Sequence, residues 1–150
     1  MDYDYDIIGG EKVPPTIISE DAIMVSKHLG SIHIENGVTY AIEADNTGSV
    51  HVHSGAKLVI AKSHTGTINL DTKSEVVIKG NAVGSVNLSP GSLLIIESSG
   101  KLIGSSYNDG RMIIRGVYGG SQSGNGEYII EESGMIKKPV IKNGNNYYYE

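Results

Sequence analysis

Three histidines are spaced so that their side chains could act together. His33 and His51 occupy equivalent positions in consecutive copies of a repeat, and His53 follows His51 by two, with the carboxylates of Glu35 and Asp71 nearby. Residues two apart in a strand point to the same face. Three imidazoles, completed by a carboxylate or a water, are a ligand set that zinc accepts in proteins. His33, His51 and His53 are therefore a candidate metal site.

The same histidines have a second interpretation. The positions equivalent to His51 in the next two copies hold Asn69 and Asn87, so the column also fits a solvated ladder of polar side chains. The sequence offers little for catalysis. An enzyme that acts by acid and base needs clustered carboxylates and a base, and the repeat places only Asp71, Glu35 and His53 together in this way. The sequence has no phosphate-binding glycine loop and no nucleophile motif. We expect no enzyme, with a polysaccharide-acting enzyme as the alternative, and no catalytic residue or cofactor. The polar ladder and the metal site both stay open.

The spacing of the histidines comes from a regular repeat in residues 30–101. The repeat has four copies, and these copies begin at Gly30, Gly48, Gly66 and Gly84. Alternate positions in the first half of each copy are aliphatic, as in a half-buried strand. A second strand follows a corner that often carries glycine. The predicted inward residues are Ile32, Val50, Ile68, Val86, Ile34, Val52, Leu70 and Leu88 in the first strand, and Tyr40, Leu58, Val76, Leu94, Ile42, Ile60, Ile78 and Ile96 in the second.

Each copy therefore predicts two strands and two or three corners, which make one turn of a coil. Stacked turns about 4.8 Å apart would pair each strand with its copies above and below. A left-handed hexapeptide helix needs an aliphatic residue every six positions, yet these steps from Ile32 reach Lys62, Ser74 and Gly80 in later copies. We therefore predict an all-β fold, a right-handed parallel β-helix (β-solenoid) of about six turns, one copy to a turn, with irregular capping segments at both ends.

The chain divides into four segments of one domain. Residues 1–20 are predicted to be an N-terminal cap or arm, because two adjacent prolines prevent regular pairing there. Residues 21–115 would form the regular turns. Residues 116–126 are rich in glycine and serine and predict a mobile loop. Residues 127–150 would hold an irregular last turn and a tail.

One outward column of the second strand breaks the polar pattern. Charges that could pair between turns flank it, for example Lys57 with Glu75, and Lys79 with Glu97 and Arg115. An apolar stripe edged by charge is typical of an interface. A tail of this chain, a second copy of it or a foreign protein could each cover the stripe. Its residues are Ile23, Ala41, Val59, Val77, Ile95 and Ile113.

Composition excludes several classes of protein. A net charge of −5 argues against binding nucleic acid through phosphates, and the absence of cysteine excludes disulfides and thiolate metal sites. No apolar run reaches the roughly 18 residues of a membrane helix, so we expect no membrane insertion. The N-terminus is acidic where a secretory signal is basic. A cytoplasmic location is therefore expected, with a virion or a cell surface as the alternative.

The repeat resembles a known family. The pattern G-x-[VI]-x-[VIL], a glycine corner and [LV]-x-I, seen best in residues 48–60 and 66–78, resembles the right-handed solenoid of the bactofilins, the bacterial polymer-forming cytoskeletal proteins. It also resembles adhesin-like β-solenoid domains. The bactofilin resemblance implies nucleotide-free polymerisation through the ends of the rod. The long irregular segments at both ends depart from that pattern and would oppose end-to-end stacking.

These observations favour a non-enzymatic structural or assembly module, a short β-helical rod that self-associates. One alternative is a cytosolic binding protein, such as an immunity or inhibitor protein that docks on a partner protein. Another is a carbohydrate-binding module or a fibre module of a phage or cell surface. The expected partner is thus a second copy or another protein, with carbohydrate as the further alternative.

Overall fold

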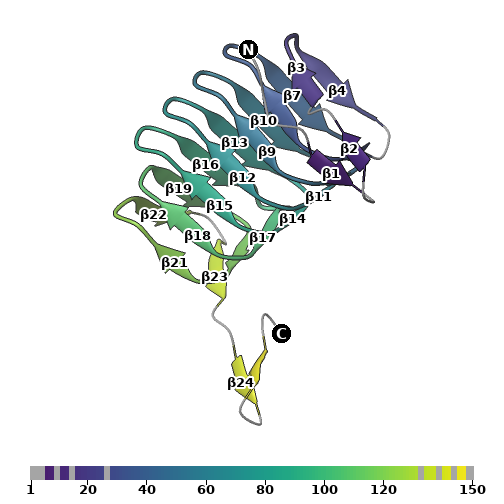
Figure 1. Ribbon diagram of the computed structural model, residues 1–150. Coiled ribbons are helices and arrows are strands. Elements are labelled where there is room, and N and C mark those ends of the chain that lie inside the picture. The colour runs from purple at the N-terminus through teal and green to yellow at the C-terminus, as the bar shows by residue number, and fades with distance from the viewer. Residues whose placement is uncertain are drawn as a thin grey trace.

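The computed structural model describes residues 6–8, 11–13, 16–25, 28–131, 134–137, 140–142 and 145–147. Within them the chain forms strands joined by tight corners, and no helix is long enough and apolar enough to cross a membrane. The turns are stacked along one axis from the N-terminal to the C-terminal end of the coil (Figure 1). This parallel β-solenoid has about six turns of about 18 residues and confirms the predicted fold class. The direction of winding stays a prediction.

Three seven-stranded parallel sheets run the length of the coil. The first sheet contains β3 (Thr16–Ile18), β6 (Ile32–Ile34), β9 (Val50–Val52), β12 (Ile68–Leu70), β15 (Val86–Leu88), β18 (Ser106–Asn108) and β21 (Gln122–Ser123). The second contains β4 (Ala22–Met24), β7 (Thr39–Ile42), β10 (Lys57–Ile60), β13 (Glu75–Ile78), β16 (Leu93–Ile96), β19 (Arg111–Ile114) and β22 (Glu127–Ile130). The third contains β5 (His28–Leu29), β8 (Asp45–Thr47), β11 (Ser63–Thr65), β14 (Asn81–Val83), β17 (Lys101–Ile103), β20 (Val117–Gly119) and β23 (Met135–Lys137).

Two antiparallel pairs lie outside these sheets. One joins β1 (Asp6–Ile8) to β2 (Glu11–Val13), and the other joins β24 (Val140–Lys142) to β25 (Asn145–Tyr147). The prolines of the predicted cap lie outside the described residues. β3 already belongs to the first sheet, where it pairs with β6. The coil therefore begins inside the segment predicted as a cap.

The predicted inward columns form the core. All sixteen side chains that the repeat assigned to the interior are buried, and most are completely inaccessible to solvent. Equivalent residues of successive turns pair in register, as Leu58 does with Tyr40 and Val76. Each aliphatic side chain thus packs on its equivalents above and below, which is why no single turn could bury its own apolar face.

Each turn has a third strand that the repeat pattern did not predict. This strand turns only its middle residue inward, so it carries no alternating apolar pair that would mark it as a strand. The prediction of two strands per turn was therefore wrong, because each turn has three. The additional strand lies where the sequence predicted one of the corners. The inward residues of this column also differ in kind: Asn46, His64, Ala82, Leu102 and Tyr118.

The register of the repeat changes near the C-terminal end. Val86 pairs with Ser106, two positions beyond the residue that the regular repeat would select. Lys101 pairs with Val117, two positions short of the residue that the regular repeat would select. The corner before β17 is thus longer than its counterparts, and the corner before β19 is shorter. The repeat pattern is degraded in residues 102–110, yet this segment still provides β18, with polar inward residues.

Strands β20 and β21 both lie within residues 116–126, where the sequence predicted a mobile loop. The glycines of this segment allow the backbones of successive turns to pack closely. A side chain at Gly120 would lie well under 3.0 Å from the backbone of Gly104 in the preceding turn. Gly120 also has a φ of 151°, which glycine adopts without steric cost.

Candidate functional site

The first sheet brings the three histidines together. His33 and His51 are the middle residues of β6 and β9 and pair directly across the sheet. His53 lies one residue after β9, and Asp71 lies one residue after β12, in the same row as His53 one turn on. The inward neighbours of His33 and His51 are aliphatic and buried, so the strand alternation directs both imidazoles outward.

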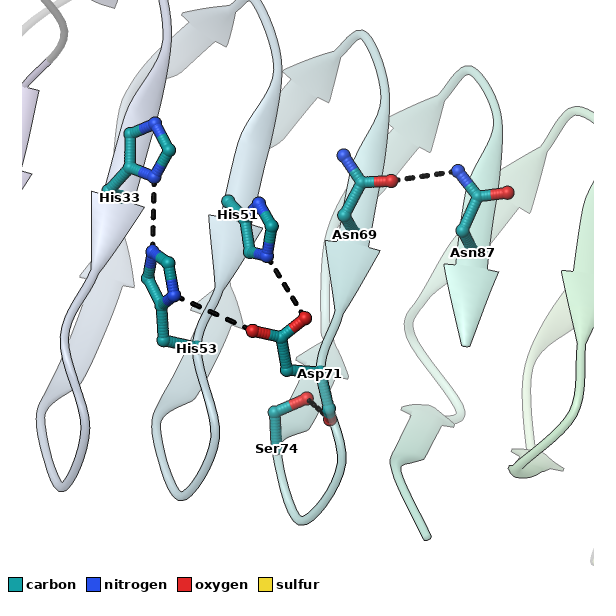
Figure 2. Close-up of polar contacts among 7 residues, drawn as sticks. All are labelled: His33, His51, His53, Asn69, Asp71, Ser74 and Asn87. Carbon is teal, nitrogen blue, oxygen red and sulfur yellow. Dashed lines mark hydrogen bonds and ion pairs between the residues drawn. The ribbon is translucent and has the colours of Figure 1, made fainter. Parts of the chain in front are cut away.

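The side chains contact one another across rows as well as along them (Figure 2). His33 Nδ1 lies 3.1 Å from His53 Nε2. The carboxylate of Asp71 contacts two imidazoles, with Oδ1 3.0 Å from His51 Nε2 and Oδ2 3.5 Å from His53 Nδ1. We call these four residues the histidine cluster. It spans three consecutive turns of the coil.

One arrangement of protons satisfies all three contacts. His51 donates from Nε2 to Asp71, and His33 donates from Nδ1 to His53 Nε2. The proton of His53 then lies on Nδ1, which faces Asp71 Oδ2 at 3.5 Å. In this arrangement every imidazole is neutral and only the carboxylate is charged. Neutral imidazole is the form that binds metal ions.

The rings are stacked and partly open to solvent. The ring centroids of His51 and His53 are 4.4 Å apart with an angle of 9° between the planes, and His33 lies 5.3 Å from His53. The exposed fractions of the side chains are 35% for His51, 20% for His53 and 38% for Asp71. A small ion from solvent can therefore reach the cluster.

The histidine column continues as the predicted polar ladder. Asn69 and Asn87 follow His33 and His51 in the same row, and Asn87 Nδ2 donates to Asn69 Oδ1 over 2.8 Å (Figure 2). The asparagines contact each other along the row. The histidine cluster differs because two of its contacts, His33 with His53 and His51 with Asp71, cross between two rows.

The second sheet carries the predicted aliphatic stripe on its outer face. Register pairing places its members side by side in consecutive strands, and the same row continues to Ile129 in β22. Ile23 is 58% exposed, whereas Val77 is only 8% exposed among its neighbours. The remaining members are half-buried: Ala41, Val59, Ile95, Ile113 and Ile129.

Ion pairs border the stripe on both sides. Lys57 Nζ lies 3.0 Å from Glu75 Oε2 on one side. On the other side Arg115 bridges two turns, with Nη1 2.9 Å from Glu97 Oε1 and Nε 3.0 Å from Glu131 Oε1. The hydrogen bond with Glu131 is the main reason that the pKa of Arg115 is raised. The predicted pairs of Lys57 with Glu75 and of Glu97 with Arg115 are thus confirmed.

A buried polar pair in the third sheet was missed by reasoning from the sequence. His64 is 1% exposed and its Nδ1 lies 2.8 Å from Asn46 Nδ2, while its Nε2 lies 3.2 Å from the carbonyl oxygen of Gly66. Burial lowers the pKa of His64 to about 4. The imidazole is therefore neutral in the folded protein at pH 7. The one clue in the sequence was its position in the repeat, which is equivalent to that of Asn46 in the preceding copy.

A second set of buried polar side chains lies inside the C-terminal turns. Tyr118 donates to Ser106 Oγ over 2.8 Å, and Ser106 also lies 2.6 Å from the hydroxyl of Tyr128. Asn108 Nδ2 donates to the carbonyl oxygen of Glu127 over 2.8 Å. These contacts pair polar atoms inside the coil, as buried polar groups require, and we assign them a structural role.

Comparison of the chain with protein-family models, curated proteins and solved structures found no match in any of the three. The structure shows a parallel β-solenoid of about six turns, and no family model confirms the bactofilin or adhesin-like type.

Proposed function

We propose that this protein is a non-enzymatic structural module, a short β-solenoid rod that self-associates face to face through the outer surface of its second sheet. The aliphatic stripe carries the proposal. Outward positions of a sheet that faces water are normally polar, whereas this row is aliphatic in seven consecutive strands. Covering it would remove the exposed part of this apolar row from water.

The charges beside the stripe favour a second copy of this chain as the partner. Their sign alternates along the rod: Lys57 is followed by Glu75, and Lys79 by Glu97 and Arg115. A face evolved for a strongly acidic or basic protein would carry one dominant sign. Alternating signs can be matched by another copy of the same face, as a two-fold interface requires.

The size of the face predicts a weak dimer. Seven strands at the usual spacing, of four residues each except the three-residue β4, cover about 29 Å by 13 Å. The projected area is about 400 Å² per partner, against about 800 Å² of accessible surface per partner in a standard interface. We therefore expect an association that depends on protein concentration, with dissociation on dilution.

Light scattering coupled to size exclusion at several protein concentrations tests this function. The native chain should change from monomer to dimer as its concentration rises. Val59→Glu places a charge in the centre of the stripe and should leave a monomer at every concentration. The matched control is Val83→Glu, because Val83 is 48% exposed on the outer face of the third sheet. That control should associate like the native chain.

Circular dichroism and thermal melts establish that both variants remain folded. A native chain that is monomeric at every concentration would refute self-association through any surface. A dimer that persists unchanged in folded Val59→Glu would refute the stripe as the contact.

A further inference from the structure

We propose that the histidine cluster binds one zinc ion per chain, with His33, His51 and His53 as nitrogen ligands and Asp71 as the oxygen ligand. This inference is independent of self-association, because the cluster lies on the first sheet and the stripe on the second. Three imidazoles and one carboxylate provide the four ligands of a tetrahedral zinc site.

The spacing of the ligand atoms is close to what zinc needs. One nitrogen from each of the three histidines lies within 4.8 Å of the others. In a tetrahedral site with zinc–nitrogen bonds of about 2.1 Å, ligand nitrogens are about 3.4 Å apart. The imidazole nitrogens therefore have to close by at most about 1.4 Å, a movement that side-chain rotation provides without a change in the backbone.

The ring orientations indicate what metal binding would change. The three rings are nearly parallel, with angles of 9° to 26° between their planes. Coordination requires the lone pairs to converge on one point, so zinc would turn the imidazoles out of this stack. The proton that joins His33 to His53 and the proton that joins His51 to Asp71 would be lost or redirected.

A simple polar ladder does not account for these contacts. In a ladder each side chain bonds its equivalent in the next turn, as Asn69 and Asn87 do. His51 is instead bonded to Asp71, which lies 20 residues on, and His33 to His53, which also lies 20 residues on (Figure 2). One nitrogen from each of the three histidines thus lies within 4.8 Å of the others, and the carboxylate of Asp71 contacts two of the rings.

The donor set also selects the class of metal. Imidazole nitrogen suits zinc and neighbouring first-row transition ions, whereas magnesium and calcium prefer sites made of oxygen. The ligands come from three consecutive turns of the coil, through β6, β9 and the residue after β12. Bound zinc would therefore fasten these turns to one another.

The experiment uses the full chain without a polyhistidine tag, stripped with a chelator and dialysed. Isothermal titration with zinc sulfate should show one site per chain. Saturation with zinc at about 100 times its Kd should raise the Tm by about 5–10 °C. Cobalt should produce the visible absorption of a tetrahedral nitrogen and oxygen site.

Substitutions distinguish the residues that bind zinc from neighbouring residues that do not. His51→Gln and His53→Gln should each weaken zinc binding by more than about tenfold, because loss of even an outer partner of a metal ligand costs that much. Two controls should bind zinc like the native chain. Asn69→Ala changes the next residue of the same row, and His64→Gln changes a histidine that is buried in the core.

A measurement on the native chain keeps the test decisive if a variant fails to fold. Zinc should shift the imidazole NMR signals of three of the five histidines and leave the other two in place. No saturable binding below millimolar zinc would overturn the proposal. Binding that persists unchanged in folded His53→Gln would do so as well, as would zinc-dependent shifts confined to other histidines.

Discussion

Acidification should destabilise this protein through His64. The imidazole is buried, its Nε2 donates to the carbonyl oxygen of Gly66, and its Nδ1 accepts from Asn46. A proton on Nδ1 would face the amide donor of Asn46 and would place a charge in the apolar coil. Desolvation is the main reason that the pKa of His64 is lowered to about 4, and the hydrogen bond to Gly66 opposes that shift.

The sign and the pH window follow from these values. The unfolded chain takes up this proton near the ordinary histidine pKa of about 6.5, whereas the folded chain takes it up only near 4. The stability that depends on neutral His64 is complete above pH about 6.5 and is lost as the pH falls toward about 4. By pH 4.5 the loss from this one group should be about 2 kcal/mol.

Urea unfolding of the native chain and His64→Gln at pH 7.0 and pH 4.5 measures this loss. Glutamine offers Asn46 an acceptor oxygen and does not titrate, while the other histidines and all carboxylates are common to both proteins. The free energy of unfolding of the native chain should fall by about 2 kcal/mol more than that of the variant over this range. Equal falls in the two proteins, or an NMR titration midpoint of His64 above 6, would refute the reasoning.

Two further pairs of substitutions, each made of a test and its control, examine how the turns are joined. Gly66→Ala should cost more than about 4 kcal/mol of unfolding free energy, because its side chain would lie well under 3.0 Å from the backbone of Gly48 and its φ is +132°. Gly37→Ala has a φ of +77° but open space around it, so chemical denaturation should show a cost of only about 1 kcal/mol. Arg115→Gln should lower the Tm at low salt and much less at high salt, because its two ion pairs lie at the surface. The same change at the exposed Lys62 should leave the Tm unchanged at both salt concentrations.

Most of the coil was predictable because two strands of each turn have alternating aliphatic residues. The pair Ile32 and Ile34 has its equivalents in Val50 and Val52 of the next copy, and all four are buried. The stripe and the histidine column followed from the same spacing, since register is maintained wherever one face of a strand is buried.

The third sheet was not predictable in this way. Its strands β8, β11, β14, β17 and β20 bury a single side chain each, and that side chain is Asn46 in one turn and Tyr118 in another. The prediction of a mobile loop at residues 116–126 was wrong for a related reason. Glycine permits flexibility, but in this segment it permits the close approach of two backbones. Composition alone does not distinguish these two uses of glycine.

The amino-acid sequence by itself determined the period of the coil, the inward residues of two sheets and the rows in which His33, His51 and the stripe lie. These are properties of a regular repeat, and the alternation of apolar and polar residues along the chain is enough to predict them. Only the tertiary structure decided that Asp71 contacts two imidazoles and that His64 pairs with Asn46 inside the core. Such contacts depend on side-chain rotation and on the width of the coil, because they join residues from different turns at distances that no spacing in the sequence specifies.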